Sequence, residues 1–260
     1  MRRSLLLFLV ACSRPDPFTR IPLDVPPGVS DLAIDDRGAL WAIPERDRVV
    51  LEIAAPGAAA VRHPLDGVPD GVDTESLVWL APGHFAIGTE GQHEATASVL
   101  YAELRGDGHI AVTSQLPITG VPLAPNEGAE GMCGRGDDLW VAIEHRGAAP
   151  LVHVKAGTIA DTSELPLTTD TGKISALACT SADDIWAIER HYGVHRILHY
   201  VAGRPKVALD LDPILHGSRN IEGIARLPDG RFVLVNDNQS AKIDGPTELL
   251  VLPASGVPRR

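Results

Sequence analysis

The sequence predicts an all-β protein, a β-propeller of four-stranded blades, on three observations. A hairpin-like segment recurs five times along the 260 residues. Two more strand-like segments follow each of the first four copies, and the fifth copy lacks a strand that the N-terminal region can supply. Short strands with glycine turns, four to each repeat, are typical of propeller blades, and no segment has a convincing long helical period.

Each copy of the hairpin joins a short apolar strand, a polar turn with Gly or Asp, and a second apolar strand that ends in an acid. The first strands begin 45, 55, 45 and 47 residues apart, at Ser30, Glu75, Glu130, Ser175 and Glu222. The acids follow 14 or 15 residues later, at Glu45, Glu90, Glu144, Glu189 and Asp237. Such a constant length indicates one structural unit repeated five times, because chance would not preserve it.

The outer strands and the closure of the ring follow from what lies between the copies. After Glu90, for example, SVLYAEL and HIAVTSQLP are joined by Arg-Gly-Asp-Gly. The last copy is followed only by TELLVLPA, so we expect FTRIPLDV at residues 18–25 to complete the last blade and hide its edge. The repeats count five blades, and six would require a cryptic blade within the longer unit between residues 75 and 130.

The first residues predict a location outside the cytoplasm. Two arginines and a short apolar run at residues 1–11 indicate a signal peptide, and Leu9-Val10-Ala11-Cys12 resembles a bacterial lipobox. That resemblance implies cleavage before Cys12, a lipid on its thiol and a tether over residues 12–17, with one propeller domain over 18–260. Ser13 resembles the outer-membrane sorting pattern of Gram-negative lipoproteins. The alternative is an ordinary signal peptide with an incidental cysteine.

Charge and cysteines limit the partners. The chain has a formal net charge of −11, and removal of Arg2 and Arg3 leaves 21 basic against 34 acidic residues, or −13. Without a basic stripe, this surface repels phosphates, so we expect no nucleic acid partner. Cys133 and Cys179 could pair in an oxidising compartment, although we favour two small buried residues that do not.

The propeller geometry predicts where the acids meet. The start of a first strand and the end of the second lie at the same end of the ring, so one mouth of the central channel would gather up to eight carboxylates. Calcium suits such oxygen ligands, and three amides lie at the same end, Asn126, Asn220 and Asn238. Basic residues beside the acids, among them Lys173 and Arg190, would offset their repulsion. The alternative is that each acid bonds backbone amides of the next blade.

Four segments resemble the family known as esterase-like activity of phytase, or phytase-like. They are DTESLVWLAPGHFAIGTEG from residue 73, NEGAEGMCGRGDDLWVAIE from 126, KISALACTSADDIWAIERHYG from 173 and NIEGIARLPDGRFVLVNDNQ from 220. The last is the most specific, although Asn236-Asp237-Asn238 replaces the family's Asp-Asp-Asn. The resemblance implies an extracytoplasmic propeller, often a calcium-dependent phosphoester or ester hydrolase by name.

Three functions remain open on this sequence. The first is a calcium-dependent hydrolase at the cell envelope, with the metal on Glu75, Glu130, Glu222 and Asp237, and with Lys173 and Arg190 facing an anionic substrate. No Gly-x-Ser-x-Gly elbow is present, so we expect no serine nucleophile. The second is a noncatalytic lipid-anchored propeller that binds an envelope protein or a small ligand. The third is a lactonase whose metal is held by Glu222, Asn126 and Asp237.

Overall fold

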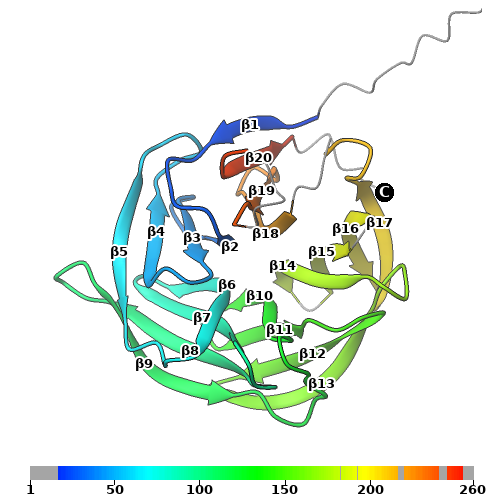
Figure 1. Ribbon diagram of the computed structural model, residues 1–260, viewed down its shortest axis with the longest axis horizontal. Helices are drawn as coiled ribbons and strands as arrows, with labels where there is room; N and C mark the ends of the chain where they lie inside the picture. The colour runs from blue at the N-terminus through cyan, green and yellow to red at the C-terminus, as the bar shows by residue number, and fades with distance from the viewer. Residues whose placement is uncertain (1–16, 182, 192, 216–219, 240–244, 254–260) are drawn as a thin grey trace, which may run out of the picture.

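The predicted all-β propeller is confirmed. The computed structural model describes residues 17–181, 183–191, 193–215, 220–239 and 245–253, and these form twenty strands arranged as a ring (Figure 1). The predicted signal peptide and Cys12 lie outside the described residues. Within the described ranges there is no helix long and apolar enough to cross a membrane.

The ring has five blades of four strands, as the repeats predicted. Blade 1 consists of β2 (Val29–Ile34), β3 (Leu40–Pro44), β4 (Val49–Ile53) and β5 (Ala60–Asp66). Blade 2 consists of β6 (Val72–Ala81), β7 (His84–Gly91), β8 (Ala97–Leu104) and β9 (Ile110–Pro117). Blade 3 consists of β10 (Ala129–Arg135), β11 (Asp138–Ile143), β12 (Ala148–Lys155) and β13 (Thr158–Pro166). Blade 4 consists of β14 (Lys173–Ser181), β15 (Asp184–His191), β16 (Val194–Val201) and β17 (Arg204–Asp210).

The fifth blade closes the ring with the first strand of the chain. It consists of β18 (Asn220–Arg226), β19 (Phe232–Asp237), β20 (Glu248–Leu252) and β1 (Thr19–Pro22), and β1 pairs antiparallel with β20. The side chain of Phe18 is buried in the core between blades 4 and 5, and Leu23 is buried in the core between blades 5 and 1. Apolar burial on both sides of β1 therefore holds the closing strand in place.

No sixth blade lies within the longer repeat. Its additional residues form the connection from β9 to β10, over residues 118–128, and this segment contains no strand. Blades 1 and 2 are also joined at their outer strands, since Leu65 and Asp66 of β5 pair in parallel with Ile110 and Ala111 of β9. The pairing merges the two blades into one eight-stranded sheet.

The core consists of five apolar layers, one between each pair of neighbouring blades. Side chains alternate between the two faces of a strand, so successive residues of an inner strand enter different layers. Leu32, for example, packs between blades 5 and 1, whereas Ala33 packs between blades 1 and 2. The inner strands therefore present mainly their backbone edges to the channel, and a side chain needs an irregularity to enter it.

Each inner strand contains such an irregularity at the same place. The pairing of every first strand with its second strand shifts register by one residue, which is characteristic of a β-bulge. The skipped residues are Ser30, Glu75, Glu130, Ser175 and Glu222. A bulge leaves its extra residue unpaired and redirects the side chain. The five residues that begin the sequence repeats are thus the ones that the backbone turns out of the sheet.

A disulfide joins two inner strands, and it corrects our expectation of unpaired cysteines. Cys133 of β10 is bonded to Cys179 of β14, with their Cα atoms 5.5 Å apart. The two residues occupy positions one residue apart in the repeat, on blades that are direct neighbours in the ring. Sequence spacing could not reveal this pairing, because only the packing of blade 3 on blade 4 brings the two strands together.

Candidate metal centre at the channel mouth

Three carboxylates from two blades converge at one mouth of the channel. Glu75, Glu90 and Glu130 each offer an oxygen atom, and these atoms all lie within 4.8 Å of one another. Glu75 and Glu130 are bulged residues of β6 and β10, whereas Glu90 lies at the end of β7. The predicted meeting of first-strand and second-strand acids at one mouth therefore occurs for this group.

A second group shares one member with the first. Oxygen atoms of Glu45, Asp73 and Glu75 also lie within 4.8 Å of one another. Asp73 was not among the residues singled out from the sequence, although it pairs across the strands with Glu90. The signal that could have found it is its place two residues before Glu75 in the Asp-Thr-Glu stretch, which puts both side chains near the same end of β6.

The two central carboxylates are buried and lack direct partners. Glu75 and Glu130 are more than nine-tenths buried, and within the part of the chain that the structure describes their carboxylates have neither a hydrogen bond nor an ion pair. Burial, followed by the charge of Glu90, raises the pKa of Glu75 well above its usual value. Burial, followed by the charge of Glu75, does the same for the pKa of Glu130. Burial and the charge of Glu144 raise the pKa of Glu90 to about 7.

On the opposite side of the mouth the protein supplies a cation of its own. Arg190 lies 2.6 Å from a carboxylate oxygen of Glu222 and donates a second hydrogen bond of 2.8 Å. Asn220 donates to Glu222 and, over 3.2 Å, to Asp237. Burial raises the pKa of Glu222 to about 7, although Arg190 works in the opposite direction.

The two cations predicted to face a substrate are both engaged with channel acids. Lys173 lies 2.7 Å from Glu144, and Arg190 holds Glu222 as described above. Lys173 and Arg190 are also cross-strand partners in β14 and β15. Their present contacts serve to balance the acids, and a role toward a substrate stays a prediction.

The other predicted mouth residues differ in their surroundings. Glu189 is fully buried and accepts hydrogen bonds from the backbone and hydroxyl of Thr168 and from the backbone of Thr169, which matches the structural alternative considered for single acids. Glu45 lies 2.9 Å from the guanidinium of Arg46. Asn238 donates to the carbonyl of Gly245 over 2.8 Å, so this amide has a backbone partner.

Close packing of the inner strands explains the glycines that follow two of the acids. A Cβ atom on Gly131 would lie 2.9 Å from the side chain of Leu177, and one on Gly223 would lie 2.8 Å from the Cα of Asp31. The pairs Glu130-Gly131 and Glu222-Gly223 thus place an acid in the channel where the next blade leaves no room for a side chain on the following residue.

Asp31 is a further buried acid that the sequence reading missed. Its side chain is fully buried, and the backbone N–H of Leu77 donates to it over 2.9 Å. Its other oxygen, Oδ1, has no hydrogen-bond partner among the described residues. Burial raises the pKa of Asp31 well above its usual value, and the charge of Glu222 adds to the effect.

A cavity of about 520 Å³ opens beside the three converging carboxylates. It is lined by Arg46, Asp73, Glu90, Gln92, His93 and Asn126. Asn126 comes from the long connection between β9 and β10, and its backbone is in the left-handed region with φ of 57°. The additional residues of the second repeat thus contribute to this polar cavity.

The fold and the site define a five-bladed β-propeller with an acidic channel mouth. The family model described as SdiA-regulated matches residues 23–189, which is more than half of the chain. The chain belongs to the SdiA-regulated family. This match supports the resemblance to phytase-like propellers as far as membership of a β-propeller family goes. The lipoprotein character stays a prediction.

Solved structures share the fold at low sequence identity. A calcium-binding regucalcin from Agrobacterium tumefaciens is 13% identical over 90% of this chain and 93% of its own, with a TM-score of 0.54. A gluconolactonase from Xanthomonas campestris is 14% identical over 89% of this chain and 74% of its own, also with a TM-score of 0.54. The aldose sugar dehydrogenase of Streptomyces coelicolor in its PQQ-bound form is 12% identical over 92% and 99%, with a TM-score of 0.53. No match was found among curated proteins.

Proposed function

We propose that the acidic mouth binds a divalent cation, calcium, and that the protein is a cation-dependent hydrolase of esters or lactones. The observation that carries the proposal is the convergence of Glu75, Glu90 and Glu130 within 4.8 Å, although none of the three forms an ion pair with a described residue. Like charges at this distance, away from water, are stable only when they are protonated or when a cation joins them.

The donor set fits calcium. All the converging atoms are carboxylate oxygens, which calcium prefers, and neither histidine nor cysteine belongs to the two groups. Glu75, Glu90 and Glu130 would hold the cation, and Glu45 and Asp73 would add negative charge from the adjoining group. Glu222 and Asp237, also predicted as ligands, share Asn220 as a donor, and Arg190 already supplies a positive charge to Glu222.

The neighbouring cavity supports a hydrolase of uncharged substrates. A bound cation would polarise an ester carbonyl and lower the pKa of a water molecule. Arg46, Gln92 and Asn126 line the cavity and offer N–H donors that can orient a substrate through its oxygens. The surrounding carboxylates repel anions, and Lys173 and Arg190 are committed to ion pairs, so we favour a neutral ester or lactone over a phosphate monoester. A gluconolactonase and a calcium-binding regucalcin that share the fold are compatible with this choice.

We also propose a location in the bacterial cell envelope, with a lipid on Cys12 and the outer membrane as the membrane partner. The Cys133–Cys179 disulfide supports an oxidising compartment.

Calorimetric titration with calcium tests the cation site. We expect saturable binding to the purified protein and its loss in the double variant Glu75→Gln/Glu130→Gln. Glu164→Gln is the matched control, because Glu164 is exposed on β13, far from the channel strands in the blade. Binding that persists unchanged in the double variant would exclude these residues as ligands.

Substrate assays test the hydrolase. A panel of δ-lactones, carboxylate esters and phosphate monoesters is incubated with the protein in calcium and in EDTA. We expect turnover of a lactone or ester that requires calcium and disappears in Glu75→Gln/Glu130→Gln. Calcium binding without turnover of any of these substrates would instead support the noncatalytic propeller. The ion pairs of Lys173 and Arg190 with channel acids are compatible with that alternative.

A further inference from the structure

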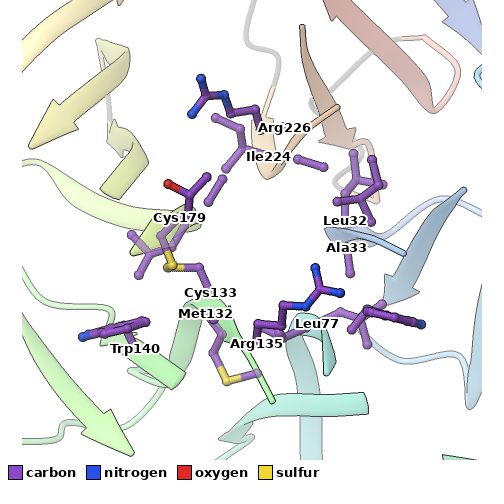
Figure 2. A pocket seen from close by; sticks show the side chains of 18 of the residues that line it. Leu32, Ala33, Leu77, Met132, Cys133, Arg135, Trp140, Cys179, Ile224 and Arg226 are labelled. Carbon is purple, nitrogen blue, oxygen red and sulfur yellow. A yellow bond between two sulfur atoms is a disulfide. The ribbon is translucent and has the colours of Figure 1, made fainter. Parts of the chain in front are cut away.

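A second cavity, of about 740 Å³, lies along the channel and is lined by residues of all five blades (Figure 2). Its lining includes the residues two places after each bulge, which are Leu32, Leu77, Met132, Leu177 and Ile224. These five side chains are almost completely buried between the blades, so they offer the cavity little surface. The volume of the cavity lies within the range of small-molecule sites, roughly 300–1,000 Å³.

The disulfide belongs to the wall of this cavity. Both Cys133 and Cys179 line it, on the neighbouring inner strands β10 and β14 (Figure 2). These two strands belong to different sheets, so the bond joins blade 3 to blade 4 across the boundary between them. A small molecule in the cavity therefore lies beside the disulfide.

The two cysteines differ in exposure. Cys133 is only 4% exposed and packs in the apolar layer between blades 3 and 4, whereas Cys179 is partly exposed at the edge of that layer. The next residue, Thr180, is exposed and is skipped in the pairing of β14 with β15. Such a bulge leaves its extra residue unpaired and disrupts the ladder locally. We therefore expect a reagent in the cavity to reach the sulfur of Cys179 first.

The exposed part of the lining is mainly hydrophilic. Among the described lining residues four are exposed, and three of these have side chains that form hydrogen bonds, namely Arg135, Thr180 and Ser181, while the fourth is Pro228. Arg135 already pairs with Asp36, so its charge is balanced within the protein. These surroundings favour a hydrophilic small molecule over an apolar one.

We propose that Cys179 is a site of thiol–disulfide exchange with a hydrophilic thiol of low molecular weight, whose body occupies the second cavity. The thiolate attacks Sγ of Cys179, a new S–S bond forms, the Cys133–Cys179 bond breaks, and Cys133 leaves as a thiolate. One disulfide replaces another, so the step consumes no oxidant or reductant besides the thiol. Because the Cα atoms of the two cysteines are 5.5 Å apart, Cys133 can attack Cys179 in turn and expel the thiol.

Single-cysteine variants test which sulfur the cavity exposes. In the chain with Cys12→Ser, the change Cys133→Ala leaves Cys179 as the free thiol, and Cys179→Ala leaves Cys133. Each variant is shown to be folded by thermal melting and is incubated with oxidised glutathione, and mass spectrometry follows the adduct. We expect Cys179 to form the adduct at least about tenfold faster than Cys133 in the folded protein, and the two rates to become equal in concentrated urea.

The chain that keeps both cysteines, again with Cys12→Ser, gives a second measurement. It is incubated with reduced glutathione and quenched with acid, and peptide mapping locates the mixed disulfide, which we expect on Cys179 and expect to disappear when the thiol is removed. The proposal is overturned if the adduct forms on Cys133, if the two folded variants react at equal rates, or if exchange occurs only after unfolding. Neither measurement involves calcium or an ester, so its failure and the failure of the proposed hydrolase are separate results.

Discussion

At the scale of single residues, buried carboxylates at the channel mouth repel one another. Glu75 and Glu130 are buried beside each other without a hydrogen bond or ion pair in the described part of the chain, whereas Glu222 is held by Arg190. The protein thus neutralises one side of the mouth with its own cation and leaves the other side to protons or to a bound ion. That asymmetry is the reason why we propose a metal site on this side of the mouth.

The raised pKa of Glu90 predicts how stability depends on pH. The pKa of Glu90 in the folded state, about 7, exceeds the ordinary 4.5, so the folded state binds this proton more tightly than the unfolded state does. The stability that protonated Glu90 contributes is therefore lost as pH rises from 4.5 to 7. In EDTA we expect Glu90→Gln to stabilise the protein by about 1–2 kcal/mol at pH 8, after allowing for solvent screening, and to have little effect at pH 4.

Urea unfolding in EDTA at the two pH values measures this effect, with Glu164→Gln as the control. Calcium should reverse the order at pH 8, because it stabilises the wild type by binding to the folded state. If Glu90→Gln were as destabilising in EDTA at pH 8 as a typical buried substitution, the proposed repulsion would be absent.

At the scale of elements, the β-bulge of the inner strand is the device that makes the site. Without it, the period of two would send Glu75 and Glu130 into the apolar layers between blades. The same strands line the second cavity, starting two residues after each bulge, so each inner strand contributes both to the acidic mouth and to that cavity. Cys133 and Cys179, which line the second cavity, join two of these strands.

The disulfide between β10 and β14 predicts a measurable loss of stability. The two cysteines are 46 residues apart, and in the chain-entropy description their removal destabilises the folded state by about 2–4 kcal/mol. Urea unfolding of a Cys133→Ala/Cys179→Ala variant measures this, in a chain that lacks residues 1–16 so that Cys12 does not interfere. A reductant should lower the stability of the parent chain and leave the double variant unchanged; equal stability of the two oxidised chains would contradict the prediction.

At the scale of the whole molecule, ring closure gives the channel its two ends. β1 supplies the last strand of blade 5, and the N–H of Leu23 donates to the carbonyl of Thr247 over 2.8 Å beyond the paired strand. Because all five inner strands run the same way around the channel, equivalent residues gather at equivalent heights. The closed ring thereby converts a repeat in the sequence into a circle of side chains in space.

We expect removal of the closing strand to lower the stability of the fold strongly. A chain without residues 1–23 exposes the edge of β20 and removes the buried side chains of Phe18 and Leu23, which should cost at least about 3 kcal/mol. Thermal melting compared with a chain that lacks only residues 1–16 measures this. Equal melting temperatures would show that β1 is dispensable for the ring.

The sequence predicted most of the architecture and part of the site. Five hairpins of nearly constant length indicated five blades, closure by the first strand and the gathering of acids, because these follow from local pattern and ring geometry. The proposed metal ligands differ from those predicted from the sequence. Glu222 and Glu75 have the same place in the repeat, but tertiary contacts place Arg190 beside Glu222 and another acid, Glu90, beside Glu75. Asp73 and Asp31 escaped notice because neither lies at the repeat's acid positions.

By itself, the sequence determined the propeller, favoured five blades over six and indicated the end at which its acids would meet, since strand period and hairpin length are encoded locally. Only the tertiary structure decided which acids remain without a direct partner, that the cysteines are bonded, and that a second cavity, lined by residues of all five blades, opens along the channel. These properties depend on side chains from different blades, and their distances are fixed only when the ring is packed and closed.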